Sequence, residues 1–264
     1  MNKKLIFILS LTILFFLIGV SLWKDGEQEG LITSWLNKGE KESEILRQNG
    51  IENGKRKELD ISGNIEEKEY YDNHISKLFQ ESFNIKINNK FFKSRNTYGF
   101  VLRDKKVINL LKKLNFSSGK KTLIVSCPEK ILKSKNKQII IAFVRGCFDT
   151  DGSLSFDKKI YNKSKFKKTR HYYPRLLFSS TSKKLAKDFY KLLIKLEFKP
   201  KFYIRTSKKE KENIKYIIQL TGDNNLKKWI KEIKIKNPSK LSRYQIWEKF
   251  GFCPPKTTYK QRTQ

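Results

Sequence analysis

Two acidic residues follow a mostly apolar segment and precede a glycine, in an order that could do metal chemistry. The segment 139–148 is predominantly apolar, and Asp149 and Asp151 come between it and Gly152. Alternating apolar residues after Gly152 are typical of a strand, so a helix is expected to end at the acids. A carboxylate at such a position suits Mg²⁺, which takes one or two protein oxygens and fills its shell with water and phosphate.

The glycines of this segment predict how the helix is placed. Gly146 lacks a side chain, so a second helix can approach closely, and Gly152 is expected to adopt the positive φ that ends a helix. Asp151 would then project beyond the helix pair, where a metal-activated water could hydrolyse a phosphodiester. The alternative interpretation is an ordinary helix end with acidic residues in a loop.

The regions on either side of this segment form an internal repeat. Hydrophobic spacing predicts a helix from Glu66, strands at 89–95 and 97–103, and a second helix from Val107. The same order of helix, strand, strand and helix returns at residues 185–196, 201–206, 215–221 and 226–233. A period of about 110 residues is long for a solenoid and indicates two pseudo-symmetric half-domains.

The segment IIIAFVRGCFDTDGSLS, from Ile139 to Ser155, resembles the LAGLIDADG motif of the DOD-type homing endonucleases. The resemblance covers residues 57–250. It implies an α+β fold in which two pseudo-symmetric αββαββα half-domains carry saddle-shaped antiparallel sheets. It also implies a Mg²⁺-dependent endonuclease, associated with introns, that hydrolyses phosphodiesters in a long double-stranded DNA site.

The resemblance also assigns roles to residues of the motif. Asp151 is implied as the catalytic residue and as a ligand of a divalent cation, Mg²⁺. Gly146, Asp149 and Gly152 are implied as residues of helix packing and the turn. The family has a basic residue near the metal, for which the sequence offers Lys105 and Lys208 without a motif to choose between them.

The net charge favours a polyanionic partner. The chain has 58 Lys plus Arg and 26 Asp plus Glu, a formal charge of +32 that exceeds what solubility requires. Basic and aromatic residues alternate without an acid over 158–175, a pattern typical of nucleic-acid binding; a solvated lysine-rich hairpin is the alternative. The predicted nucleic-acid-binding residues are Lys158, Lys159, Lys163, Lys165, Lys167, Lys168, Arg170, Arg175, Lys201, Arg205, Lys208, Lys93, Arg95 and Arg103.

The expected domain boundaries follow the repeat. A hydrophobic N-terminal helix is expected at 1–26, and a linker or irregular strands at 27–64. The first half-domain is expected at 65–138 and the second at 139–251. A basic tail is expected at 252–264, and from Pro254 onward this polar segment is expected to be disordered.

The cysteines predict neither a disulfide framework nor a structural zinc site. Cys127, Cys147 and Cys253 are odd in number and widely spaced, without a C-x-x-C pair. The chain has two histidines, His74 and His171, as imidazole ligands, which is too few for the usual zinc motifs.

The N-terminal region departs from the family pattern. A single-chain enzyme would carry a second motif before the first repeat, where the uncharged segment from Leu5 to Trp23 lies. Asp25 follows this segment and is a weak candidate for the second metal ligand. One extra residue separates its glycine from its acid, which rotates the acid by about 100° on a helix. The segment is also long enough to cross a bilayer.

Several alternatives remain open at this level. Residues 5–23 are a degenerate first motif buried as a core helix, a membrane anchor, or a start region acquired by gene rearrangement. The protein is accordingly expected in the cytoplasm, with or without a membrane tether, as a monomer, with a homodimer not excluded. The alternative functions are a non-catalytic nucleic-acid-binding protein, an RNA maturase on the same scaffold, or a membrane-anchored protein that binds anionic lipid.

Overall fold

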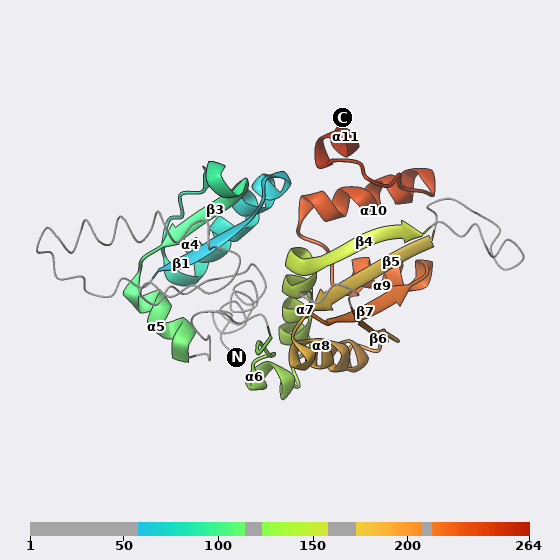
Figure 1. Ribbon diagram of the computed structural model, residues 1–264, viewed down its shortest axis with the longest axis horizontal. Helices are drawn as coiled ribbons and strands as arrows, with labels where there is room; N and C mark the ends of the chain where they lie inside the picture. Colours follow the sequence, from blue (N-terminus) through green and yellow to red (C-terminus); the bar gives the residue numbers. More distant parts are fainter. Residues whose placement is uncertain (1–57, 114–122, 158–172, 207–212) are drawn as a thin grey trace, which may run out of the picture.

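The computed structural model describes residues 58–113, 123–157, 173–206 and 213–264, which form an α+β structure with two antiparallel sheets (Figure 1). The first sheet has the strand order β1-β3-β2, and the second has the order β4-β5-β7-β6. The strands are β1 Leu59–Asn64, β2 Lys90–Phe92, β3 Thr97–Leu102, β4 Gly152–Asp157, β5 Tyr173–Ser180, β6 Lys201–Arg205 and β7 Lys215–Thr221.

Helices connect the strands in both halves. The first half has a 3-10 turn at Ile65–Glu67, α3 Lys68–Tyr70, a π-helical turn at Tyr71–Ile75, α4 Ser76–Phe83, a 3-10 turn at Lys93–Arg95, α5 Lys105–Lys113 and α6 Glu129–Leu132. The second half has α7 Lys137–Asp151, α8 Lys183–Lys195, α9 Asp223–Glu232, α10 Pro238–Phe250 and α11 Tyr259–Thr263.

The predicted internal repeat is confirmed by the topology of the sheets. In the first half, β1 leads through a helical region to β2 and β3, and β3 lies between the other two strands. In the second half, β5 leads through α8 to β6 and β7, and β7 lies between β5 and β6. The first sheet therefore begins at β1, before the predicted boundary at residue 65, because β1 pairs with β3 over its whole length.

The core of the second half lies between its sheet and helices α7, α8 and α9. Alternating residues of the strands are buried there, as expected for a sheet with one covered face. Phe178 of β5 stacks on Phe189 of α8 with ring centroids 4.2 Å apart. Phe148 of α7 lies 4.8 Å from Trp229 of α9. The Phe148–Trp229 contact fixes the end of α7 against α9, and the Phe178–Phe189 pair joins the sheet to α8.

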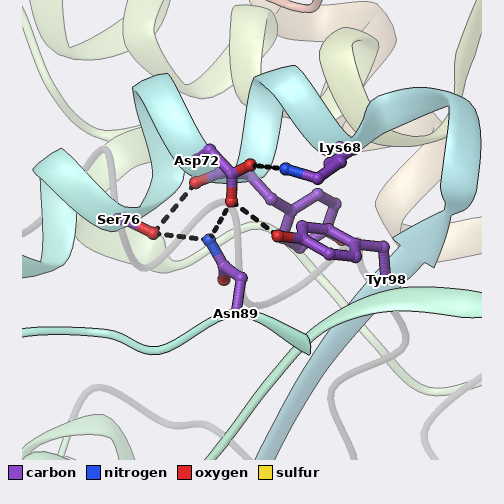
Figure 2. Close-up of polar contacts among 6 residues, drawn as sticks. Lys68, Asp72, Ser76, Asn89 and Tyr98 are labelled. Atoms are coloured by element: carbon purple, nitrogen blue, oxygen red, sulfur yellow. Dashed lines mark hydrogen bonds and ion pairs between the residues drawn. The ribbon is translucent and has the colours of Figure 1, made fainter. Parts of the chain in front are cut away.

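The first half has a smaller core and adds a polar cluster around Asp72 (Figure 2). The Asp72 carboxylate pairs with Lys68 and accepts hydrogen bonds from Asn89 Nδ2 at 2.8 Å and the Tyr98 hydroxyl at 2.9 Å. Asn89 Nδ2 also donates to Ser76 Oγ at 2.8 Å. The cluster ties the π-helical turn to the segment before β2 and to β3.

The prediction of a disordered tail is wrong for its last residues, which form α11. Thr258 caps this helix, and its hydroxyl and the Gln261 side chain form a capping box. Arg262 is buried against α10, where it donates to Ser242 Oγ at 2.9 Å and to the Ser239 carbonyl at 2.9 Å. A buried arginine with these partners holds the tail in place.

Two further predictions concern the cysteines and the N-terminus. Cys127, Cys147 and Cys253 are buried as free thiols. Within the described residues, no helix has the length and apolar character needed to span a bilayer. The predicted helix at residues 5–23 lies outside the described part of the chain.

Candidate active site at the end of helix α7

Helix α7 carries both motif acids at its C-terminal end. Asn136 caps its start by accepting a hydrogen bond from the Gln138 amide at 2.8 Å. The helix ends at Asp151, and the Gly152 amide still donates to the Phe148 carbonyl before the chain continues into β4. The helix-to-strand change that the sequence predicted therefore lies directly at the acids.

The predicted role of Gly152 as a positive-φ residue is wrong. Its φ is −76° and its ψ is 163°, which is extended backbone open to any residue. A Cβ atom at this position would lie 2.4 Å from Phe148 Cδ2 and 2.6 Å from the Phe148 carbonyl oxygen. Glycine is required here because the strand turns back closely over the last turn of the helix.

Lys240 of α10 holds the C-terminal end of α7. Its ammonium group donates to the carbonyl oxygens of Phe148 at 2.9 Å, Asp149 at 2.6 Å and Thr150 at 2.7 Å. The last carbonyls of a helix have no partner within it, and they attract a cation because the helix dipole is negative there. Burial lowers the pKa of Lys240, while the nearby carboxylates of Glu67, Asp149 and Asp151 oppose this shift.

Asn237 joins the end of α7 to the first half of the molecule. Its side-chain amide donates to the Asp149 carbonyl at 2.8 Å and to Glu67 Oε1 at 2.7 Å. Its side-chain oxygen accepts from the Ser239 amide at 3.1 Å and so caps α10. Asn237 is fully buried, and burial raises the pKa of its partner Glu67. One side chain therefore connects α7, α10 and the 3-10 turn after β1.

Asp149 is buried and faces the protein interior. Its Oδ2 accepts from the Lys236 amide at 3.0 Å, whereas its buried Oδ1 has no hydrogen-bond partner among the described residues. Burial raises the pKa of Asp149 to about 7, although Lys240 opposes the shift. These surroundings suit a packing residue and leave the carboxyl inaccessible to a ligand.

Asp151 differs from Asp149 because the residue is exposed to solvent. Protein nevertheless surrounds much of the Asp151 carboxyl group, and this burial raises its pKa. Lys240 opposes the rise in pKa, and the nearby carboxylate of Glu67 adds to it. Of the two motif acids, Asp151 is the one that a ligand can reach. Sequence reasoning assigned the same difference to this pair through the family resemblance.

The donor atoms at this end of α7 fit a cation that is shared with a phosphate. In the described ranges, no three His, Cys, Asp or Glu side chains gather in a group that could hold a metal alone. Mg²⁺ commonly takes one or two carboxylates and completes its shell with substrate phosphate and water. The exposed carboxylate of Asp151 fits this type of site, and an all-protein cage is not present among these residues.

A cavity of about 380 Å³ lies between β4 and α10, and its lining begins at Gly152, the residue after Asp151. Its lining includes Gly152, Ser153, Lys240, Arg243 and Lys256. Because three of these side chains are basic, the cavity offers a positive surface next to the exposed acid. The Arg243 guanidinium donates to the Thr257 carbonyl at 3.5 Å and also contacts the Cys253 side chain.

The predicted nucleic-acid-binding residues divide into those that the structure describes and those it does not. Arg95 pairs with Asp60 at 2.5 Å and Arg103 with Glu58 at 2.9 Å, so both are partly neutralised. Lys93, Lys201 and Arg205 are exposed on or beside the sheets. Outside the described residues lie Lys158, Lys159, Lys163, Lys165, Lys167, Lys168, Arg170 and Lys208, and also Asp25, the candidate for the second metal ligand.

The structure also identifies residues that sequence reasoning missed. Lys240 is a basic residue beside the motif acids, whereas α5, which Lys105 begins, lies well away from the junction of α7 and β4 in Figure 1. The other candidate, Lys208, lies outside the described residues. The Asn237-Pro238 pair is a helix-start signal that could have been noticed. Nothing local in the sequence indicates that this helix start lies against Asp149 or Glu67.

Known proteins resemble this chain both in sequence and in fold. Residues 138–234 match the family model described as a LAGLIDADG-like domain. A curated relative, the probable translation initiation factor IF-2 of Methanocaldococcus jannaschii, is 28% identical over 148 residues. The match covers 54% of this chain but 11% of the relative, so the chain spans about a tenth of that protein's length.

Two solved structures of the homing endonuclease I-DmoI share the fold. A complex of I-DmoI with DNA and Mn is 16% identical, with a TM-score of 0.50, and the match covers 87% of this chain and 97% of that one. A structure of mesophilic I-DmoI variants is also 16% identical, with a TM-score of 0.51 and coverage of 87% and 96%. Residues 138–234 are therefore similar to a LAGLIDADG-like domain, in a chain that has the fold of the homing endonuclease I-DmoI.

Proposed function

We propose that this chain is a site-specific endonuclease that hydrolyses phosphodiester bonds in double-stranded DNA with Asp151 and Mg²⁺. The observation that carries the proposal is the contrast at the end of α7, where Asp149 is buried and Asp151 is exposed. The fold of a homing endonuclease solved with DNA and Mn and the formal charge of +32 support it.

In this proposal the residues around Asp151 act by positioning it. Lys240 and Asn237 hold the last carbonyls of α7, so the Asp151 carboxylate keeps one place relative to the bound duplex. The basic side chains of Arg243 and Lys256 in the adjacent cavity receive a backbone phosphate of the DNA. A divalent cation bound at Asp151 would polarise the scissile phosphate and lower the pKa of its bound water.

The experiment incubates the purified full chain and Mg²⁺ with a plasmid that carries the sequence flanking its own gene. We expect cleavage at one site, which Asp151→Asn reduces to background while duplex binding persists. Asp223→Asn, at the exposed start of α9, is the matched control and should cleave normally. Cleavage that survives Asp151→Asn would overturn the assignment of this residue.

A second candidate is a non-catalytic nucleic-acid-binding protein or RNA maturase on the same scaffold. It is favoured by one observation: the acids next to Asp151 are already engaged, Glu67 by Asn237 and Asp149 by the Lys236 amide. This candidate predicts specific binding to DNA or RNA by the wild-type chain without cleavage, and equal binding by Asp151→Asn.

A further inference from the structure

The second sheet presents one face away from its core, and the strand register shows which side chains lie together on it. Residues on the opposite face, such as Leu176, Phe178 and Ile218, are buried under the helices. The outward residues form rows across the strands: Asp157 with Tyr173; then Ser155, Arg175 and Thr221; then Ser153, Leu177, Gln219 and Lys201; then Ser179, Ile217 and Tyr203; and finally Lys215 with Arg205. We call this set the open face.

The middle of the open face is uncharged. Gln219 lies between Leu177 on β5 and Lys201 on β6. In the next row, Ile217 lies between Ser179 and Tyr203, and Tyr203 is 43% exposed. Apolar surface that remains accessible on a strongly basic protein indicates a binding role.

The basic residues of the open face lie toward its margins. Arg205 and Lys215 pair at one end of β6 and β7, and Lys201 is on the edge strand. Arg175 is nearer the centre, but its guanidinium lies 3.2 Å from Ser155 Oγ and 3.4 Å from the Asp157 carboxylate. Its side chain is therefore partly committed within the protein.

Bases differ in the groups that they offer to such a surface. In the major groove, guanine is read chiefly by Arg or Lys, adenine by a bidentate Asn or Gln, and the thymine methyl by apolar side chains. The middle of the open face supplies a glutamine and apolar groups, whereas marginal lysines and arginines suit phosphates. This composition matches A·T pairs better than G·C pairs.

We infer that the open face of the second sheet reads an A·T-rich half of the recognition site, with Gln219 contacting an adenine and Leu177 and Ile217 contacting thymine methyl groups. The inference rests on the proposed function, since it assumes that the sheet lies in the major groove of bound DNA. It goes beyond the proposed function by naming the base pairs that the second half of the molecule prefers.

The test selects binding sites for the full chain from a pool of randomised duplexes, without divalent cations so that bound DNA stays intact. We expect one half of the selected site to be A·T-rich. Gln219→Ala should remove the adenine preference at one position of that half, by about tenfold or more, and leave the other positions unchanged. Gln138→Ala, at the far end of α7, is the matched control and should select the wild-type site.

A second variant introduces a basic side chain on the open face instead of truncating a side chain there. Ile217→Arg should gain a preference for guanine at a position where the wild type selects thymine or adenine. The inference is overturned if Gln219→Ala weakens all sequences equally, or if both halves of the site are G·C-rich while binding stays specific. If the wild-type chain selects no duplex sequence at all, the proposed function fails as well.

Discussion

The two halves of the molecule share one topology but stabilise it with different chemistry. In the second half, α8 is a regular helix whose Phe189 stacks on Phe178 of the sheet. In the first half, the equivalent helical region is interrupted by a π-helical turn and is tied down by the polar cluster around Asp72 (Figure 2). A smaller apolar core can thus keep the same strand order when partly buried polar groups find partners.

The halves also contribute differently to the contact between them. The helical region after β1 supplies acids, whereas α10 and the residues that follow supply their partners. Asn237 donates to Glu67 at 2.7 Å, and the Tyr259 hydroxyl donates to Glu69 at 2.5 Å. The second half therefore organises the candidate site, and the first half is attached to it through these acids.

The largest change in stability is expected for a substitution of Lys240, whose side chain holds the end of α7. Lys240→Met should lower the free energy of unfolding by about 3 kcal/mol, because three helix-end carbonyls and the nearby carboxylates lose their cation. Urea denaturation at pH 7 measures this change. Lys236→Met, which removes an exposed lysine beside the site, is the control. A loss no greater than that of the control would mean that Lys240 does not stabilise the end of α7.

A pH-dependent difference between the halves is expected from His74 in the π-helical turn. Burial lowers the pKa of His74 from 6.5 to about 4, with Lys236 and Arg145 adding to the shift. Between these values the unfolded chain binds more protons, so His74 makes stability rise with pH, and its contribution is lost as pH falls from about 6.5 to about 4.

The measurement compares wild type with His74→Phe, which keeps an aromatic ring next to Tyr70. Across pH 4 to 6.5 the free energy of unfolding of the wild type should fall by about 2 kcal/mol more than that of the variant. Parallel curves for the two proteins would show that His74 is protonated equally in the folded and unfolded states.

The smallest effect is expected for the link between the halves. In a double-mutant cycle of Glu67→Ala and Asn237→Ala, we expect a coupling free energy of about 1 kcal/mol, since the two share one buried hydrogen bond. Thermal or urea unfolding of the four proteins gives the coupling. Pairing Asn237→Ala with Glu69→Ala is a suitable control because Glu69 bonds Tyr259 instead. Strict additivity for Glu67 and Asn237 would deny that this bond joins the halves.

The elements that were predicted well depend on local patterns. Helix α7 follows from its apolar segment, and β4 and β7 follow from residues that alternate between core and solvent. The exposed position of Asp151 follows from its place at the very end of that helix. These features require information from neighbouring residues alone.

The remaining features depend on contacts between distant residues. Asn237 donates a hydrogen bond to Glu67, which is 170 positions away in the sequence, and Lys240 donates to carbonyls about 90 positions away. No local sequence pattern predicts either contact. Gly152 is required by the approach of the Phe148 ring and carbonyl rather than by its own backbone angles. The sequence by itself determined the repeat, the motif helix and its two acids. Only the tertiary structure decided which side chains surround the two acids and hold the end of α7, because packing sets those distances.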